Sequence, residues 1–121
     1  GGMEMNLKEL FKDTIRGGWA VDKFSMYAKF QAQPGARDSL VEILLEAAAG
    51  AGADPDCELY VVNVSETEPE AVWVTEVWSS KAAHDASLQD EATRAMIQRA
   101  MPLIAGVESI PLRPVGGKGI K

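Results

Sequence analysis

Residues 72–88 read Val-Trp-Val-Thr-Glu-Val-Trp, followed by Ser-Ser-Lys-Ala-Ala-His-Asp-Ala-Ser-Leu. The first half alternates aromatic and β-branched residues, a pattern typical of a strand. Because side chains alternate between the two faces of a strand, Glu76 shares one face with the apolar side chains Val72, Val74 and Trp78. Burying a carboxylate there is costly unless it is paired, hydrogen-bonded or protonated. We therefore expect a partner for Glu76, and we expect that partner to take part in the function.

The second half of this stretch predicts a helix that carries His84, the single histidine of the chain. Ser79 and Ser80 are of the residue type that caps helix N-termini. A continuation is predicted from Asp90 to Pro102, with apolar side chains at helical spacing.

The same patterns outside this stretch predict three more strands and another helix in the domain. The expected strands are 24–32, 57–64 and 107–115, and Pro111 and Pro114 confine the last one to an edge or a bulge. A helix is expected at 40–48, ending around Gly50 and Gly52. The resulting α+β order, β-α-β-β-α-β, is ferredoxin-like. A short amphipathic helix at residues 7–15 is expected to precede it.

Composition narrows the class of protein. The 121 residues suit one domain, and a net charge of −6 argues against nucleic acid or an anionic membrane surface as partner. No apolar run reaches the roughly 18–20 residues of a membrane span. Cys57 is the single cysteine, so no intrachain disulfide can form, and we expect a cytoplasmic protein.

The two strands expected at 57–64 and 72–78 are apolar on both faces. Helices of one chain can cover only one face of this sheet. We therefore expect the other face to meet a second copy, which makes the protein a homodimer.

Taken together, these stretches resemble the antibiotic biosynthesis monooxygenase family, small dimeric α+β barrels that include quinol monooxygenases. The resemblance rests on residues 27–35 as first strand and turn, Glu-Val-Trp at 76–78 and Ala-His-Asp-Ala-Ser-Leu at 83–88. Met-Pro-Leu-Ile-Ala-Gly at 101–106 and Val-Gly-Gly-Lys-Gly at 115–119 resemble the quinol monooxygenase branch. The chain is interpreted as an N-terminal extension, 1–22, and a domain of this family, 23–121.

The resemblance implies an oxidation that uses neither flavin nor metal. Family members bind an electron-rich phenol, anthrone or quinol and make it anionic, and the anion passes an electron to molecular oxygen. It follows that the expected partner is a small aromatic molecule, that oxygen is the co-substrate, and that no cofactor is expected. One histidine and one cysteine far apart in sequence also argue against a zinc site.

The candidate catalytic residues are His84, as proton acceptor, and Glu76, which orients His84 or acts as the base itself. The candidate substrate-binding residues supply aromatic, soft or hydrogen-bonding side chains; they are Trp78, Tyr60, Asn63, Ser87, Arg94 and Met96. Tyr60 and Asn63 lie on opposite faces of their strand, so at most one is expected to share a cavity with His84.

Less specific interpretations stay open for these residues. Glu76 could be a structural carboxylate, salt-bridged to Lys29 or Arg94, and His84 a capping residue. Met96 at helical spacing could belong to the core. An isomerase acting on a small keto-sugar phosphate would need Lys29, Arg94 and Arg99 to converge, and a non-catalytic ligand-binding dimer fits the fold equally well.

The chain departs from the family pattern at several positions. Many members carry histidines at places held here by Ser87 and Ala92, whereas His84 comes six residues after Trp78. The haem-degrading branch uses an asparagine, a tryptophan and a histidine, and the corresponding positions are Lys29, Ser87 and Ile97. Haem degradation is therefore not expected.

Overall fold

The computed structural model describes residues 22–120, so the helix predicted at 7–15 lies outside the described residues. The order of elements is β-α-β-β-α-α-β, and their bounds are β1 Phe24–Ala32, α2 Arg37–Ala51, β2 Cys57–Val64, β3 Ala71–Trp78, α3 Lys81–Ser87, α4 Glu91–Ala100, the 3-10 turn η1 Met101–Leu103 and β4 Ile104–Leu112. This is the predicted ferredoxin-like fold, with the second helix divided in two. Asp90 divides it, because its side chain accepts a hydrogen bond from Thr93 N–H and so begins α4 anew.

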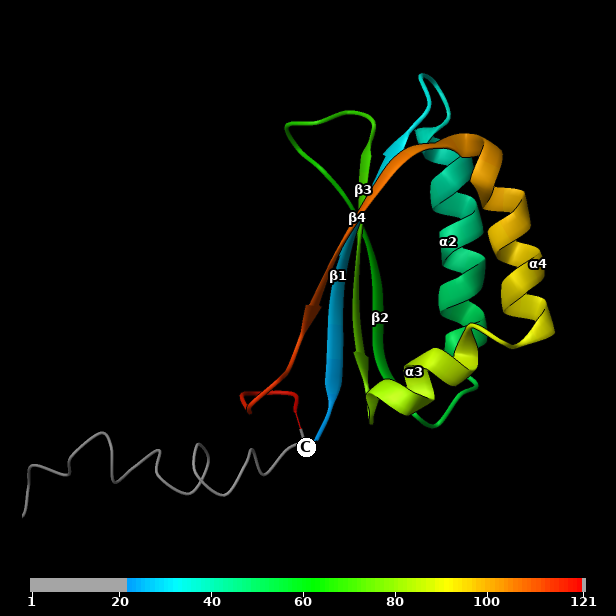
Figure 1. The fold of residues 1–121 in the computed structure, drawn as a ribbon. Helices are drawn as coiled ribbons and strands as arrows, with labels where there is room; N and C mark the ends of the chain where they lie inside the picture. Colours follow the sequence, from blue (N-terminus) through cyan, green and yellow to red (C-terminus); the bar gives the residue numbers. More distant parts are fainter. Residues whose placement is uncertain (1–21, 121) are drawn as a thin grey trace, which may run out of the picture.

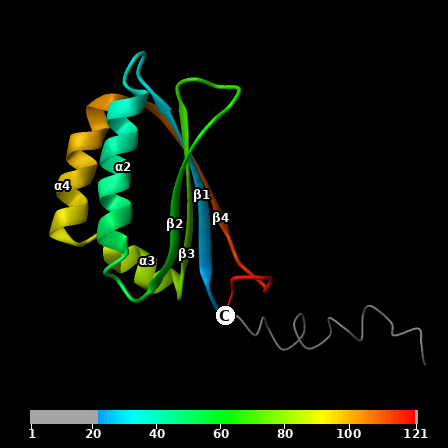
Figure 2. The same ribbon diagram turned by 180° about the vertical axis from the view of Figure 1, so that it is seen from behind.

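The four strands form one antiparallel sheet in the order β2-β3-β1-β4. Within residues 22–120, the three α-helices lie on the same side of this sheet, and no described helix lies on the opposite side (Figure 1). The view from behind shows α2 and α4 side by side, with α3 set apart at the end of the sheet where β3 finishes (Figure 2). The two faces are called here the covered face and the open face.

The covered face holds the hydrophobic core. Register places Val72, Val74, Glu76 and Trp78 of β3 on it, opposite Phe30, Ala28, Met26 and Phe24 of β1. Leu40 of α2 packs into this layer and is fully buried, as are Val72 and Val74. Burial of such side chains supplies most of the driving force for folding.

The open face leaves large apolar side chains in contact with solvent. The most exposed apolar side chains of the open face come from β1, β2 and β4 and are 40–46% exposed. They are Tyr27, Leu59, Val61, Ile110 and Leu112. Trp73 lies among them, with the Lys29 ammonium 5.6 Å from its ring centroid. Exposed apolar side chains gathered on one face of a sheet are typical of an interaction surface.

Two element boundaries differ from the sequence prediction. β4 begins at Ile104 and ends at Leu112, whereas residues 107–115 were expected. Pairing with β1 begins at Ala32 through a register shift after Gln31, which captures the residues before Val107. α2 begins at Arg37, before the expected residue 40, while its end at Ala51, with Gly52 as the C-cap at a φ of −62°, agrees with the prediction.

The remaining boundaries follow the sequence patterns closely. β1 and β2 span the predicted residues, and β4 is an edge strand, which is where Pro111 is tolerated. Gly35, at a φ of +76°, makes the turn after β1. Within residues 22–120, every helix is too short or too polar to cross a membrane.

Candidate functional site

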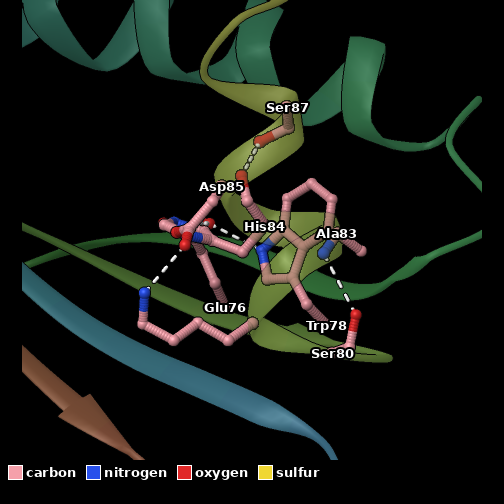
Figure 3. A network of polar contacts seen from close by, with 8 residues as sticks. Glu76, Trp78, Ser80, Ala83, His84, Asp85 and Ser87 are labelled. Atoms are coloured by element: carbon pink, nitrogen blue, oxygen red, sulfur yellow. Dashed lines mark hydrogen bonds and ion pairs between the residues drawn. The ribbon is translucent and has the colours of Figure 1, made fainter.

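β3 and α3 bring Glu76 and His84 together, as Figure 3 shows. The His84 Nε2 atom lies 4.0 Å from Glu76 Oε1, and the two side chains are 8% and 12% exposed. The connection is short because Ser80 caps α3 directly after β3, its Oγ accepting a hydrogen bond from Ala83 N–H at 3.0 Å. This cap turns the chain back so that His84 lies over the end of the covered face.

Trp78 is the hydrogen-bond partner that the buried carboxylate requires. Its indole Nε1–H donates to Glu76 Oε1 at 2.8 Å, and the tryptophan is 3% exposed. The two residues lie two positions apart on β3 and share its covered face. This hydrogen bond fixes the position of one Glu76 carboxylate oxygen.

The imidazole of His84 lies against aromatic rings on its sheet side. Its centroid is 4.8 Å from that of Phe24 and 5.7 Å from that of Trp78, the latter in an edge-to-face arrangement. On the solvent side, His84 Nδ1 lies 3.0 Å from Asp85 Oδ1, and Lys81 Nζ donates to Asp85 Oδ2 at 2.7 Å. Hydrogen bonding to Lys81, and then to His84, holds the pKa of Asp85 below its ordinary value.

Side chains of the neighbouring strands surround Glu76. Tyr60 of β2 and Met26 of β1 lie directly opposite it, and Cys57 lies opposite Trp78. Burial, followed by the charge of Glu76, raises the pKa of Tyr60, so its hydroxyl keeps its proton as a hydrogen-bond donor. The same two causes raise the pKa of Cys57 to about 11, so its thiol is neutral at physiological pH.

Of the remaining expected binding residues, Ser87 contacts this group at the His84 backbone, whereas Asn63 and Arg94 lie elsewhere. Asn63 lies on the open face and donates to Trp73 O at 3.2 Å and to Thr75 Oγ1 at 3.3 Å. Arg94 is an exposed residue of α4. Ser87 supports the helix of His84, because its hydroxyl donates to His84 O at 2.6 Å. Met96 is partly buried against the hydrophobic core.

Neither ion pair considered for Glu76 forms: among the described residues, the ionisable group within 4.0 Å of it is His84, and neither Lys29 nor Arg94 pairs with it. Lys29 extends from the open face and pairs with Glu68 at 2.8 Å, so it does not reach Glu76 on the opposite face. Arg99 pairs with Glu46 at 3.0 Å, joining α4 to α2. Lys29 lies on the open face, whereas Arg94 and Arg99 belong to α4 on the other side of the sheet, so the three cations expected for a sugar phosphate do not converge within this chain.

Two hollows in the described surface lie away from Glu76 and His84. One of about 260 Å³ is lined by Lys29, Gln31, Gly106, Val107 and Glu108. Another, of about 230 Å³, is lined by Gly35, Arg37, Asp38, Pro69 and Glu70. In residues 22–120, no three His, Cys, Asp or Glu side chains converge as a metal site.

Three neighbours of the pair were missed by the sequence reasoning. Phe24 and Met26 alternate with polar residues in their strand, a signal that indicated a buried face and not a site. Asp85 adjoins His84 in the sequence, but adjacency on a helix does not by itself predict a contact between side chains.

The chain is similar to known proteins in both sequence and structure. The sequence pattern of the family described as "Antibiotic biosynthesis monooxygenase" matches residues 24–99. A crystal structure from Chloroflexus aurantiacus, named "putative Antibiotic biosynthesis monooxygenase", is 41% identical, covers 82% of this chain and 99% of its own, and superposes with a TM-score of 0.74. No curated protein matches the chain in sequence.

More distant structures share the fold alone. A Caulobacter crescentus protein of the same printed name is 23% identical, with 81% and 94% of the two chains covered and a TM-score of 0.75. SnoaB, a cofactor-independent oxygenase from Streptomyces nogalater, is 13% identical, with 80% and 97% covered and a TM-score of 0.71.

Proposed function

The chain belongs to the antibiotic biosynthesis monooxygenase family, and from that premise we propose that it oxidises a small aromatic or quinol substrate with molecular oxygen, without a cofactor. The observation that carries the proposal is the pair Glu76–His84. The two groups are nearly buried, lie 4.0 Å apart and are surrounded by aromatic side chains. A proton acceptor in such dry surroundings can make a phenol or quinol anionic.

The proposed chemistry needs no external reductant. His84, with Glu76 beside it, takes a proton from an acidic O–H or C–H of the substrate. The anion gives one electron to oxygen, and the substrate radical combines with the superoxide formed. Loss of water then leaves a carbonyl where the substrate had two hydrogens, so one oxygen atom enters the product and the other leaves as water. The carbon loses the four electrons that oxygen gains.

The substrate would lie beside Glu76, between Tyr60 and Met26. Met26 is half-buried and unbranched, and such a side chain can change rotamer to admit a ring. The protonated hydroxyl of Tyr60 can donate a hydrogen bond to a developing oxyanion, a contact that is strong where water is excluded. Trp78 keeps Glu76 in position throughout.

Oxygen uptake tests the proposal, with metal-free protein and a panel of quinols and anthrones. We expect turnover by the wild type and a loss of about 100-fold in kcat for His84→Ala and for Glu76→Gln. Glu46→Gln, an exposed carboxylate of α2 in an ion pair, is the matched control and should retain full activity. Ligand binding without oxygen consumption across the panel would contradict an oxygenase and favour a binding protein.

We also propose that two copies pair through their open faces to make a cytoplasmic homodimer. Support comes from the exposed apolar residues of that face, among them Tyr27 of the inner strand β1 and Ile110 of the edge strand β4, at 44% and 46% exposure. A mass in solution at micromolar concentration equal to two chains is the expected result. The mass of a single chain at that concentration would contradict the dimer.

A further inference from the structure

We propose that Asp85 is a positioning residue, which holds His84 in the tautomer with its proton on Nδ1 and leaves Nε2, the nitrogen facing Glu76, free to accept a proton. The direction in which the proton moves rests on the proposed function. The tautomer itself rests on geometry alone.

The two ring nitrogens of His84 face two carboxylates at different distances. Nδ1 lies 3.0 Å from Asp85 Oδ1, within hydrogen-bond reach, whereas Nε2 lies 4.0 Å from Glu76 Oε1, beyond it. An ionised carboxylate has only acceptor atoms, so the group that donates across the 3.0 Å contact is Nδ1–H. A neutral ring has one N–H, and its other nitrogen, Nε2, then carries the lone pair.

The surroundings of Asp85 keep it ionised and in place. Lys81, one helical turn earlier on α3, donates to its other oxygen at 2.7 Å. The Asp85 side chain is 50% exposed, so water can solvate its charge, while the imidazole behind it is buried. The charged groups within 4.0 Å of the ring are thus Asp85, from its own helix, and Glu76, from the sheet. Lys81 contacts Asp85, and Cys57 and Tyr60 lie opposite Trp78 and Glu76 in the sheet.

With its proton on Nδ1, His84 can accept a proton on Nε2, next to Glu76. When Nε2 takes a proton, the imidazolium formed has a carboxylate at each nitrogen, which stabilises the charge. Without Asp85, the neutral ring would be free to place its proton on Nε2, and the nitrogen facing the site could no longer accept one. Orientation by a partner of the second nitrogen is a general device for histidine.

The test exploits the single histidine, because 15N-labelled protein gives one set of imidazole signals that need no assignment by mutation. At a pH where the ring is neutral, we expect the wild type to be protonated on Nδ1. Asp85→Ala should give a mixture of tautomers or the Nε2–H form, and Asp85→Glu should restore the wild-type pattern. Asp38→Ala, which removes an exposed, ion-paired aspartate of α2, should change nothing.

A wild-type ring protonated on Nε2 would overturn the proposal, even if no variant folds. An Asp85→Ala spectrum identical to that of the wild type would also overturn it. With an oxidised substrate in hand, Asp85→Ala should lower kcat on the order of tenfold while KM changes little. A wild type that turns over no substrate defeats the proposed function, whereas the tautomer result still decides the role of Asp85.

Discussion

The two faces of β3 differ in how they are covered, although they belong to one strand. On the covered face, Val72 and Val74 are fully buried, and the strand ends in the hydrogen-bonded pair Glu76 and Trp78. On the open face, Ala71 and Val77 near the two ends are buried, Trp73 and Thr75 between them stay partly exposed, and the neighbouring strands add exposed apolar side chains. The polar pair of this strand thus lies in the layer that is shielded from water, whereas exposed apolar side chains lie on the open face.

The largest expected difference between the two faces is the loss of stability caused by an aspartate introduced on each of them. Val74→Asp puts an unpaired carboxylate into the core, and we expect a loss of more than about 4 kcal/mol in the free energy of unfolding. Val61→Asp, at a position 40% exposed on the open face, should fold normally and weaken the proposed dimer. Denaturant unfolding and the mass in solution measure the two effects. Equal destabilisation by both substitutions would contradict the distinction between the faces.

Replacing each of the two tryptophans of β3 should give a smaller difference in stability between the two faces. Trp78→Phe removes the donor to a nearly buried carboxylate, and the lost hydrogen bond should cost about 1.5–3 kcal/mol. Trp73→Phe keeps an aromatic ring under Lys29 on the open face, so a smaller change is expected there. Urea midpoints of the two variants check the difference. If Trp73→Phe costs more, the hydrogen bond to Glu76 contributes little.

The N-terminal cap of α3, at the end of the covered face, should make a smaller contribution to stability. Ser80→Ala removes the acceptor of Ala83 N–H, and we expect a loss of about 1 kcal/mol in stability. Ser39→Ala, at an exposed position within α2, should be neutral or slightly stabilising because alanine is the better helix former. Thermal unfolding of both variants measures the effect. A neutral Ser80→Ala would mean that packing alone holds α3 on the sheet.

The reactivity of the Cys57 thiol depends on the charge of Glu76 and can be measured without an added label. With its pKa raised from 9.0 to about 11, the thiol should react with iodoacetamide about 100-fold more slowly than an ordinary cysteine near pH 8. Because the charge of Glu76 contributes to this rise, Glu76→Gln should speed the reaction. Alkylation rates across a pH series measure it.

The raised pKa also predicts how stability depends on pH. The folded thiol binds its proton more tightly than the unfolded one, so its contribution is fully present below pH 9 and is lost as pH rises toward about 11. Cys57→Ala should remove that part of the alkaline loss. An alkylation profile with an ordinary midpoint would contradict the burial of this thiol near Glu76.

Alternation and spacing predicted most of the fold. The bounds of β1 and β2 follow from alternation, and Ser80 and Asp90 mark the starts of α3 and α4. The β4 boundaries were wrong because a register shift in β1 decides where pairing begins, and a shift of this kind has no signature in the sequence of β4.

For the candidate site, the sequence singled out Glu76 and His84, and period two placed Trp78 on the same face as Glu76. It did not indicate the hydrogen bond between Trp78 and Glu76, or that Arg94 of α4 is exposed. Both depend on rotamers and on how helices pack, which local patterns do not encode.

The sequence by itself determined which side chains share each face of each strand, because that alternation is a property of the backbone. It also determined the helix starts, since capping acts between residues three positions apart. Only the tertiary structure decided that Asp85 meets one nitrogen of His84 while Glu76 faces the other. The physical reason is that this arrangement depends on the angle at which α3 crosses the end of the sheet, which is set by packing against Phe24 and Trp78 from two different strands.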